Sequence, residues 1–287
     1  SDYSEDLKID KAILNQHAES YRKIRNTLRF LLGNLNDKLL NDDFSKIEYS
    51  KLSSLEKYIL TQVYDFDLRF RDYIKSYNFH KIYIELLNFC TLDLSAFYFD
   101  IKKDILYCDS ENSQRRNNCL EILNVLINFL LKWFSPILAF TSEEAYQVIK
   151  NKKYKSIHLQ DFPVIPFMWN NSEIKNKWIG IKKVKQVVNA AIEDIRNKKI
   201  IGSSLEANVI VYLKDEYLNI IKQEDLSEIF ICSEAKAESF INQNDLFSLK
   251  DVEGVAVKIL KAKGQKCSRC WKILEKPCSR DICGLKN

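Results

Sequence analysis

Residues 17 to 36 read His17-Ala-Glu-Ser-Tyr-Arg-Lys-Ile-Arg-Asn-Thr-Leu-Arg-Phe-Leu-Leu-Gly-Asn-Leu-Asn36. At about 100° per residue, one face of a helix over this run collects apolar side chains and the opposite face collects cations. The apolar face comprises His17, Tyr21, Ile24, Leu28, Leu31 and Leu35. The cationic face comprises Arg22, Arg25, Asn26 and Arg29. The pattern predicts an amphipathic helix that packs inward through the first face and meets solvent or a partner through the second.

The cationic face has two interpretations. Arginines three and four residues apart, with Asn26 among them, form a row of planar donors suited to phosphate oxygens and base edges. An ordinary solvated helix surface has the same composition. The pattern by itself leaves both interpretations open.

Hydrophobic periodicity predicts further helices in the first half of the chain. They cover 53–77, 79–100, 115–134 and a short segment that ends near 150, with Thr141 to Glu144 as its cap. The helix over 115–134 is the most apolar, so we expect it at the centre of a bundle. The helix over 79–100 is expected to bury Ile84, Leu87, Leu92 and Leu94. Residues 102–104 and 108–112 are predicted to be polar connections.

The composition changes around residues 163–172, which indicates a domain boundary. A long helix over 173–199 follows, then strands over 207–213, 229–232 and 255–259 and a helix over 216–221. The predicted fold is therefore mainly α. A helical bundle covers 1–154, a small α/β module covers 155–260, and a basic zinc-binding tail covers 261–287.

Composition places the chain among globular proteins, since its 287 residues are 46% hydrophobic and 29% charged. We find no run that approaches the roughly 18 apolar residues of a membrane span, and no signal-peptide pattern. We therefore expect a cytoplasmic protein without membrane contact. The net charge of +5 is segregated. Residues 258–287 hold nine Lys/Arg against two Asp/Glu, and residues 8–35 hold six against two. A polyanionic partner that binds both islands would explain this segregation, while chance clustering stays open for either island alone.

Four of the eight cysteines lie in the last 21 residues, which favours a metal site in a reducing compartment. Cys267 and Cys270 form a Cys-x2-Cys turn, which directs two thiolates to one point, and Cys278 and Cys283 can supply the other two ligands of a tetrahedral zinc. Four thiolates leave no open position for water, so we expect this zinc to be structural. We also expect that removal of the zinc unfolds only the tail. The remaining cysteines are interpreted as dispersed residues: Cys90, Cys108, Cys119 and Cys232.

Catalytic signals are missing from the sequence. It has no Gly-rich phosphate loop and no suggestive Ser/His/Asp or Cys/His spacing. His80 is interpreted as a helix-entry or core residue. This stretch alone is therefore not expected to catalyse a reaction.

Tyr21 to Leu35 resembles the opening helix of the anticodon-binding domain of bacterial-type isoleucyl-tRNA synthetases, a family of class I aminoacyl-tRNA synthetases. Residues 135–146, 156–163, 178–213 and 266–272 resemble the same family in the same order. The resemblance implies the anticodon-binding and C-terminal part of a larger enzyme, which joins isoleucine to its tRNA using ATP. The two short ATP-site motifs of that class are absent here, so ATP and Mg belong to a catalytic domain outside this sequence. The sequence also has no initiating Met, as expected for a piece of that enzyme.

The resemblance also implies partners: tRNA(Ile), and the catalytic and editing domains of the same chain, in a monomeric enzyme. The residues implied to bind the anticodon stem and loop are Arg22, Lys23, Arg25, Asn26, Arg29, Arg269, Trp271 and Lys272. Trp271 has two interpretations: it stacks on an unpaired base, or it packs inward as the core of a small zinc module.

One feature departs from the family pattern, in which the second cysteine pair is usually another Cys-x2-Cys. Here Lys286 stands three residues after Cys283, so either Cys278 replaces the missing ligand or the site is altered. Two alternatives to the isoleucine family also stay open. One is the same region of a valyl-, leucyl- or methionyl-tRNA synthetase, and the other is a non-enzymatic, zinc-stabilised scaffold that binds protein.

Overall fold

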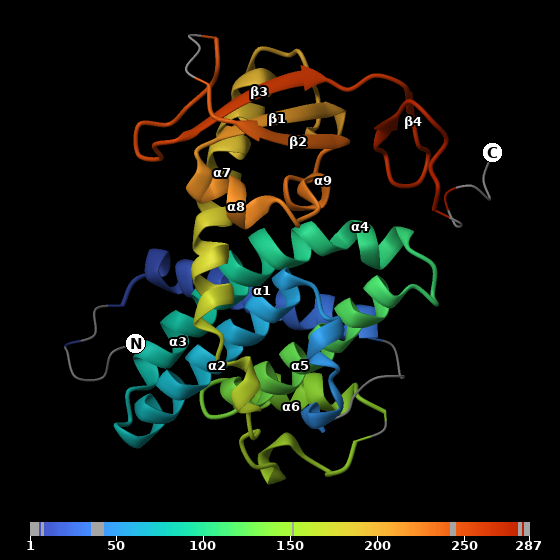
Figure 1. Ribbon diagram of the computed structural model, residues 1–287. Helices are drawn as coiled ribbons and strands as arrows, with labels where there is room; N and C mark the ends of the chain where they lie inside the picture. Colours follow the sequence, from blue (N-terminus) through green and yellow to red (C-terminus); the bar gives the residue numbers. More distant parts are fainter. Residues whose placement is uncertain are drawn as a thin grey trace. The chain divides into compact units, whose positions relative to one another are not determined.

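The computed structural model describes residues 6, 9–35, 43–150, 152–241, 245–280 and 283 (Figure 1). The chain forms two compact units. Unit 1 comprises Ser1–Asp100 and Gln114–Asn171, and unit 2 comprises Ile101–Ser113 and Ser172–Asn287. The predicted three-part division at 154/155 and 260/261 stays a prediction. The units follow a different grouping, because residues 101–113 join the second unit and its main segment begins at Ser172.

Unit 1 is a helical bundle. Its elements are α1 (Lys11–Leu35), α2 (Ser54–Lys75), α3 (Phe79–Asn88), the π-helical segment η4 (Phe89–Phe99), α5 (Gln114–Phe134) and α6 (Ala139–Gln147). Short 3-10 turns lie at Phe44–Lys46, Tyr49–Lys51, Ile157–Leu159 and Phe167–Trp169. As predicted, α5 is central: it contacts α1, α2 and α6, and most of its residues are buried.

Helix α1 begins before the predicted run, because the Asp10 carboxylate accepts a hydrogen bond from the Ile13 amide (2.8 Å) and caps it. Ile24, Leu28, Leu31 and Leu35 are buried, as the helical period requires. The other two members of the predicted apolar face are not: His17 is exposed and Tyr21 is half-buried. The predicted end near Asn36 lies outside the described residues.

The core of unit 1 is aromatic and encloses the buried carboxylate of Asp67. Trp133 packs between Phe66 and Phe129, with ring centroids 4.6 and 5.1 Å away. Asp67, which is 2% exposed, accepts hydrogen bonds from Trp133 Nε1 (2.9 Å) and Arg71 Nε (2.5 Å). The buried charge is thus paired and hydrogen-bonded, as a buried charge must be.

The prediction of a helix over residues 79–100 is confirmed, but the face that it was expected to bury is partly wrong. Ile84 and Leu92 are exposed, whereas Leu94 is buried as predicted. The buried positions Ile82, Leu86, Cys90 and Leu94 recur every four residues. The segment therefore contains two alternative sets of apolar residues, the predicted one and the observed one. The wider turn of the π-helical segment η4 keeps residues four apart on the buried face.

The helix does not end near residue 100. It continues as α4 (Asp100–Cys108), so the predicted connection at 102–104 is wrong. Lys102 is buried and pairs with Glu228 (3.0 Å), which makes a charged residue compatible with a packed helix. The continuous helix Phe79–Cys108 is long and apolar enough to cross a membrane by length and composition alone. The same properties are typical of core helices in soluble proteins, and 44% of its most apolar window is buried.

The start of α6 also differs from the prediction. Helix α6 begins at Ala139, after Leu138, and not at the polar run from Thr141. Thr141 and Glu144 instead use their side chains in contacts with α1.

Unit 2 is a small α/β module. Its strands are β1 (Ala207–Leu213), β2 (Glu234–Ser239) and β3 (Val255–Lys261), in the order β2-β1-β3, and a separate hairpin pairs β4 (Gln265–Lys266) with β5 (Ile273–Leu274). Strand β1 is parallel to β2 and antiparallel to β3. Its helices are α4, α7 (Ser172–Asn197), α8 (Asp215–Ile221) and α9 (Leu226–Ile229), and α7 packs on β1 and β3 (Figure 1). The mainly α fold class with a small sheet is confirmed.

The predicted strand over 229–232 is wrong. Ile229 is the last residue of α9, whose first turn is capped by Asp225, and residues 230–232 follow in a turn where Ile231 has a φ of 55°. Lys185 Nζ donates to the Ile229 carbonyl (2.6 Å), so tertiary contacts override the β-branched composition. The second strand is the charged segment Glu234–Ser239, which lies at a sheet edge where charged side chains are tolerated.

Candidate metal centre and candidate nucleic-acid interface

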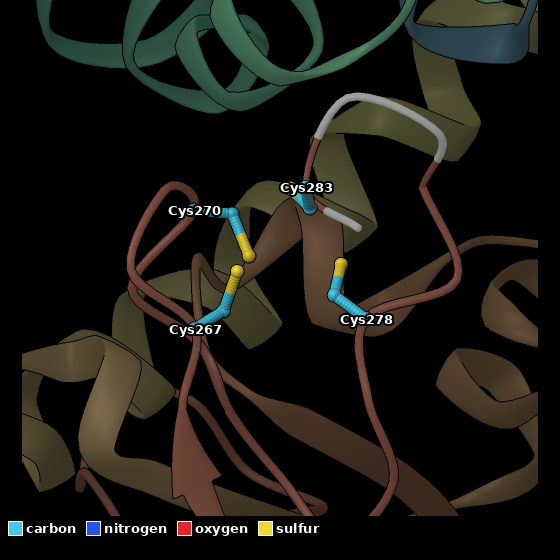
Figure 2. Close-up of side chains that lie close together, drawn as sticks. All are labelled: Cys267, Cys270, Cys278 and Cys283. Carbon is cyan, nitrogen blue, oxygen red and sulfur yellow. The ribbon is translucent and has the colours of Figure 1, made fainter. Parts of the chain in front are cut away.

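The four tail cysteines come together in unit 2. One sulfur from each of Cys267, Cys270, Cys278 and Cys283 lies within 4.8 Å of the others. Figure 2 shows the four side chains gathered around one point, with the sulfurs of Cys267, Cys270 and Cys278 directed toward it. Cys270 and Cys283 are buried, and Cys267 and Cys278 are half-buried.

A tight hairpin presents the first pair. At Gly264, φ is +117° and an added Cβ would lie 2.1 Å from the Leu274 carbonyl oxygen, so only glycine fits. The Cys267 amide donates to the Lys272 carbonyl (2.9 Å), and the Trp271 amide donates to the Cys267 carbonyl (3.0 Å). Trp271 therefore sits in the left-handed region, with a φ of 62°.

The thiols of the cluster differ in pKa because their surroundings differ. Burial opposes ionisation of Cys267, but hydrogen bonds from the Cys270 and Arg269 amides lower its pKa to about 7. Burial raises the pKa of Cys270 to about 11, and burial with the neighbouring thiols raises the pKa of Cys283 further. A bound cation favours thiolates at all four positions, since ligation deprotonates a coordinating thiol.

These residues fit a four-coordinate metal ion. A Zn–S distance of about 2.3 Å places tetrahedral sulfurs about 3.8 Å apart, so sulfurs within 4.8 Å need only a small contraction. The cluster can therefore hold a metal ion. Cys278 belongs to it, although the family pattern has a ligand elsewhere. With four sulfur ligands, such an ion would support structure and leave no position for a reactive water.

Cys108 was interpreted as a dispersed residue, but it lies against this cluster. It is 5% exposed and packs with Cys270 and Cys283 in one buried group, with Cys267 and Cys278 at its edge. Nothing in the local pattern around Cys108 indicates this, because its neighbours Cys270 and Cys283 lie 162 and 175 residues further along the chain.

The predicted tRNA-binding residues of the tail have different environments. Arg269 Nη2 donates to the Tyr107 carbonyl (2.7 Å), and Lys272 Nζ to Ser227 Oγ (3.3 Å). Trp271 is 60% exposed, and Lys266 Nζ lies 5.9 Å from the centre of its ring. This exposure excludes the interpretation that Trp271 forms the core of the tail.

The cationic face of α1 is partly occupied by acidic partners in unit 1. Arg25 donates from Nη1 and Nη2 to both carboxylate oxygens of Glu144 (2.7 and 2.8 Å), and Nη1 also lies 3.2 Å from Tyr21 Oη. These hydrogen bonds raise the pKa of Arg25 and lower that of Glu144. Arg22 pairs with Glu19. Within the described ranges, neither Lys23 nor Arg29 forms an ion pair, and both are exposed.

A groove of about 400 Å³ runs between α1 and α6. Three of the predicted residues, Arg25, Asn26 and Arg29, line it, whereas Arg22 and Lys23 do not. Its other lining residues are Leu28, Leu32, Gly33, Thr141, Glu144, Ala145 and Val148. The groove thus combines cationic and amide donors with an apolar floor. The sequence did not predict the contribution of Thr141 and Glu144, which lie more than 100 residues from α1.

Residues 56–211 match the family model of the anticodon-binding domain of tRNA ligase, and this match covers more than half of the chain. The chain belongs to the family of tRNA-ligase anticodon-binding domains. The matched range begins in α2 and ends in β1, so α1 and the tail lie outside it.

Similarity to individual proteins extends over nearly the whole chain. The chain is 48% identical over 280 residues to the isoleucine--tRNA ligase of Pelagibacter ubique, which covers 98% of this chain and 30% of that protein. It is 39% identical over 274 residues to that of Agrobacterium fabrum, with 95% and 28% covered. With that of Syntrophomonas wolfei it shares 36% over 285 residues, with 98% and 30% covered. The chain therefore spans less than a third of the length of these relatives.

Proposed function

We propose that this chain is the tRNA-binding part of an isoleucine--tRNA ligase, and that it binds the anticodon stem and loop of tRNA(Ile). The family match over 56–211 carries the proposal, and the similarity to isoleucine--tRNA ligases favours isoleucine over valine, leucine or methionine. In the whole enzyme, the catalytic domain would use ATP and Mg to attach isoleucine, and an editing domain would belong to the same chain. We further propose a monomeric, cytoplasmic enzyme, and the eight free cysteines are compatible with a reducing compartment.

The two candidate surfaces would hold RNA by different chemistry. Arg29 and Asn26 in the α1–α6 groove offer a guanidinium and an amide, which suit phosphate and base edges. Trp271 offers an exposed ring beside Lys266, which suits an unpaired anticodon base. Arg22, Lys23, Arg25, Arg269 and Lys272 would contribute charge nearby.

We propose that the metal is zinc, one ion per chain, bound by Cys267, Cys270, Cys278 and Cys283. Thiolate ligands in a tetrahedral set select zinc among the common protein metals, apart from iron–sulfur chemistry. Metal analysis of the purified chain tests this assignment, with one zinc and no iron as the expected result. Iron with inorganic sulfide would overturn it.

Filter binding at two salt concentrations tests the RNA proposal. A tRNA(Ile) transcript should bind with an affinity that falls as salt rises, because binding to phosphates releases counterions. The same transcript with an altered anticodon should bind more weakly at both concentrations. Equal binding of both RNAs would remove anticodon reading, and no RNA binding at either concentration would favour the protein-binding scaffold.

A further inference from the structure

Each ligand pair of the metal centre carries one arginine, and both arginines reach the same helix end. Arg269 lies between Cys267 and Cys270, and Arg280 lies between Cys278 and Cys283. Arg280 Nη1 and Nη2 donate to the two carboxylate oxygens of Asp104 (2.8 and 2.5 Å). Its Nε is 3.5 Å from Asp109.

Arg269 contacts the same end of α4. Arg269 Nη2 donates to the Tyr107 carbonyl (2.7 Å), in the last turn of α4. Carbonyls at a helix C-terminus lack partners within the helix and carry partial negative charge, so a guanidinium is favoured there. Between the two contacts, Cys108 is buried against Cys270 and Cys283. Both ligand loops therefore hold one helical turn.

The other end of α4 is also fixed within unit 2. Lys102, which is 2% exposed, pairs with Glu228 of α9 (3.0 Å). Lys272, directly after Trp271, donates to Ser227 Oγ of the same α9 (3.3 Å). The hairpin that carries Trp271 is thus tied to α4 through Arg269 and to α9 through Lys272.

We propose that the metal centre works as a clamp: metal binding joins the two ligand loops, sets the spacing of Arg269 and Arg280, and so fixes the C-terminal turn of α4. The clamp makes Arg269, Arg280 and Asp104 positioning residues for the outward-facing Trp271. It rests on the proposed metal binding but not on tRNA binding. It also changes the expectation from sequence that metal removal unfolds only the tail.

Hydrogen exchange of the 287-residue chain, with zinc and after chelation, tests the clamp directly. The probe is the Asp109 amide, which donates to the Ile105 carbonyl (3.1 Å) in the last turn of α4. Chelation should speed exchange in residues 104–109 as well as in the tail. Exchange in α5 should not change. Unchanged protection of residues 104–109 in the chelated chain would overturn the clamp.

Variants separate the arginine contact from the metal itself. Asp104→Asn and Arg280→Gln should each retain one zinc and speed exchange of residues 104–109 by about ten- to a hundredfold, the effect of losing a charged hydrogen bond. The double variant should resemble Arg280→Gln, because that single change already removes the pair with Asp104 together with the longer contact with Asp109. The matched control is Asp194→Asn on α7, which removes an exposed carboxylate paired with Lys198 and should change nothing at α4.

Fluorescence of Trp271 provides a second measurement. It should change only if Asp104 and Arg280 position Trp271, and not if they merely stabilise α4. Trp133, Trp169 and Trp178 are fully buried, so Trp271 dominates quenching of tryptophan fluorescence by an added solute. Zinc-loaded Asp104→Asn should differ from wild type in the quenching of Trp271. Arg280→Lys keeps a positive charge opposite Asp104, so its quenching should lie closer to the wild-type value than that of Arg280→Gln. Additive effects in the double variant, or wild-type quenching in Asp104→Asn, would overturn the positioning role. Loss of tRNA binding by the wild-type chain would overturn only the proposed function.

Discussion

Helix α1 and the tail both carry clustered arginines, but the two regions use them differently. On α1, Arg25 is held by Glu144 at the surface, while Arg29 stays exposed at the groove. In the tail, Arg269 and Arg280 are used inside unit 2, against α4. A count of cations along the sequence therefore overstates the charge available to a polyanion, and more so in the tail.

This difference predicts two kinds of RNA contact. The α1 face should act mainly through charge, so changes there should alter the dependence of affinity on salt. The tail should act mainly through the Trp271 ring, so a change there should alter affinity at every salt concentration. The predictions below test this contrast.

The largest expected effect is loss of the metal. Cys283→Ser and Cys278→Ser should each lower zinc content well below one per chain, because a hydroxyl in place of a thiolate leaves the four-sulfur ligand set incomplete. Circular dichroism should show that the helices of unit 1 persist. The control is Cys232→Ala, which removes a buried thiol of unit 2 outside the cluster. Full zinc content in Cys278→Ser would remove that ligand from the set.

Trp271→Ala should have the next largest effect. Loss of one stacked base should weaken binding of tRNA(Ile) by about ten- to a hundredfold, since stacking contributes roughly 1–3 kcal/mol. Zinc content and the salt slope should stay unchanged. The control is Phe167→Ala, which removes another exposed aromatic ring (77% exposed) far along the chain. Equal affinity for tRNA(Ile) in wild type and Trp271→Ala would leave the tail with charge alone.

Changes on α1 should be smaller and should depend on salt. Arg29→Ala should flatten the slope of log affinity against log salt by somewhat under one unit, because one phosphate contact is lost. Arg25→Ala should have less effect, as its guanidinium is already paired with Glu144. Glu144→Gln should strengthen binding, because it releases Arg25 and removes a negative charge from the groove.

Arg196→Ala is the matched control for α1, since it removes one exposed arginine of α7. A wild-type salt slope in Arg29→Ala would identify the α1 face as ordinary solvated surface. Weaker binding by Glu144→Gln would show that the pair with Arg25 is needed to orient the guanidinium.

Local sequence patterns predicted those elements whose buried face follows from the residue spacing within a single helix or strand. The apolar stripe of α1, the central position of α5 and the strand over 207–213 depend on spacing within one segment, so the sequence contains the signal. The Cys-x2-Cys turn is equally local. Cys278 was identified because a tetrahedral zinc needs two further thiolates, which Cys278 and Cys283 can supply.

Long-range pairing explains what the sequence could not predict. Lys102 and Asp104 resemble a polar connection until their partners are known, and those partners lie 126 and 176 residues away. Arg25 likewise depends on Glu144, which is 119 residues distant. Strand β2 lacks an apolar run because it is a charged edge, so β-branched residues 229–232 were preferred in its place.

The smallest expected effect concerns the backbone of Trp271. Its φ of 62° costs an L-residue about 1–2 kcal/mol, whereas glycine adopts this region freely. Glycine also loses more conformational entropy on folding, by about 0.5–1 kcal/mol. Trp271→Gly should therefore hold zinc more tightly than Trp271→Ala by only about 0.5–1 kcal/mol, the difference between these terms.

Competition with a chelator measures this difference, and tRNA binding separates it from the ring's role. Both variants lack the ring, so they should bind tRNA(Ile) equally weakly. Wild type would then keep a strained residue at the metal centre because only a side chain at this position can stack on RNA. If Trp271→Gly and Trp271→Ala hold zinc equally tightly, the left-handed backbone is not a cost to the tail. Wild-type tRNA affinity in either variant would show that the strained residue serves the metal centre and not the RNA.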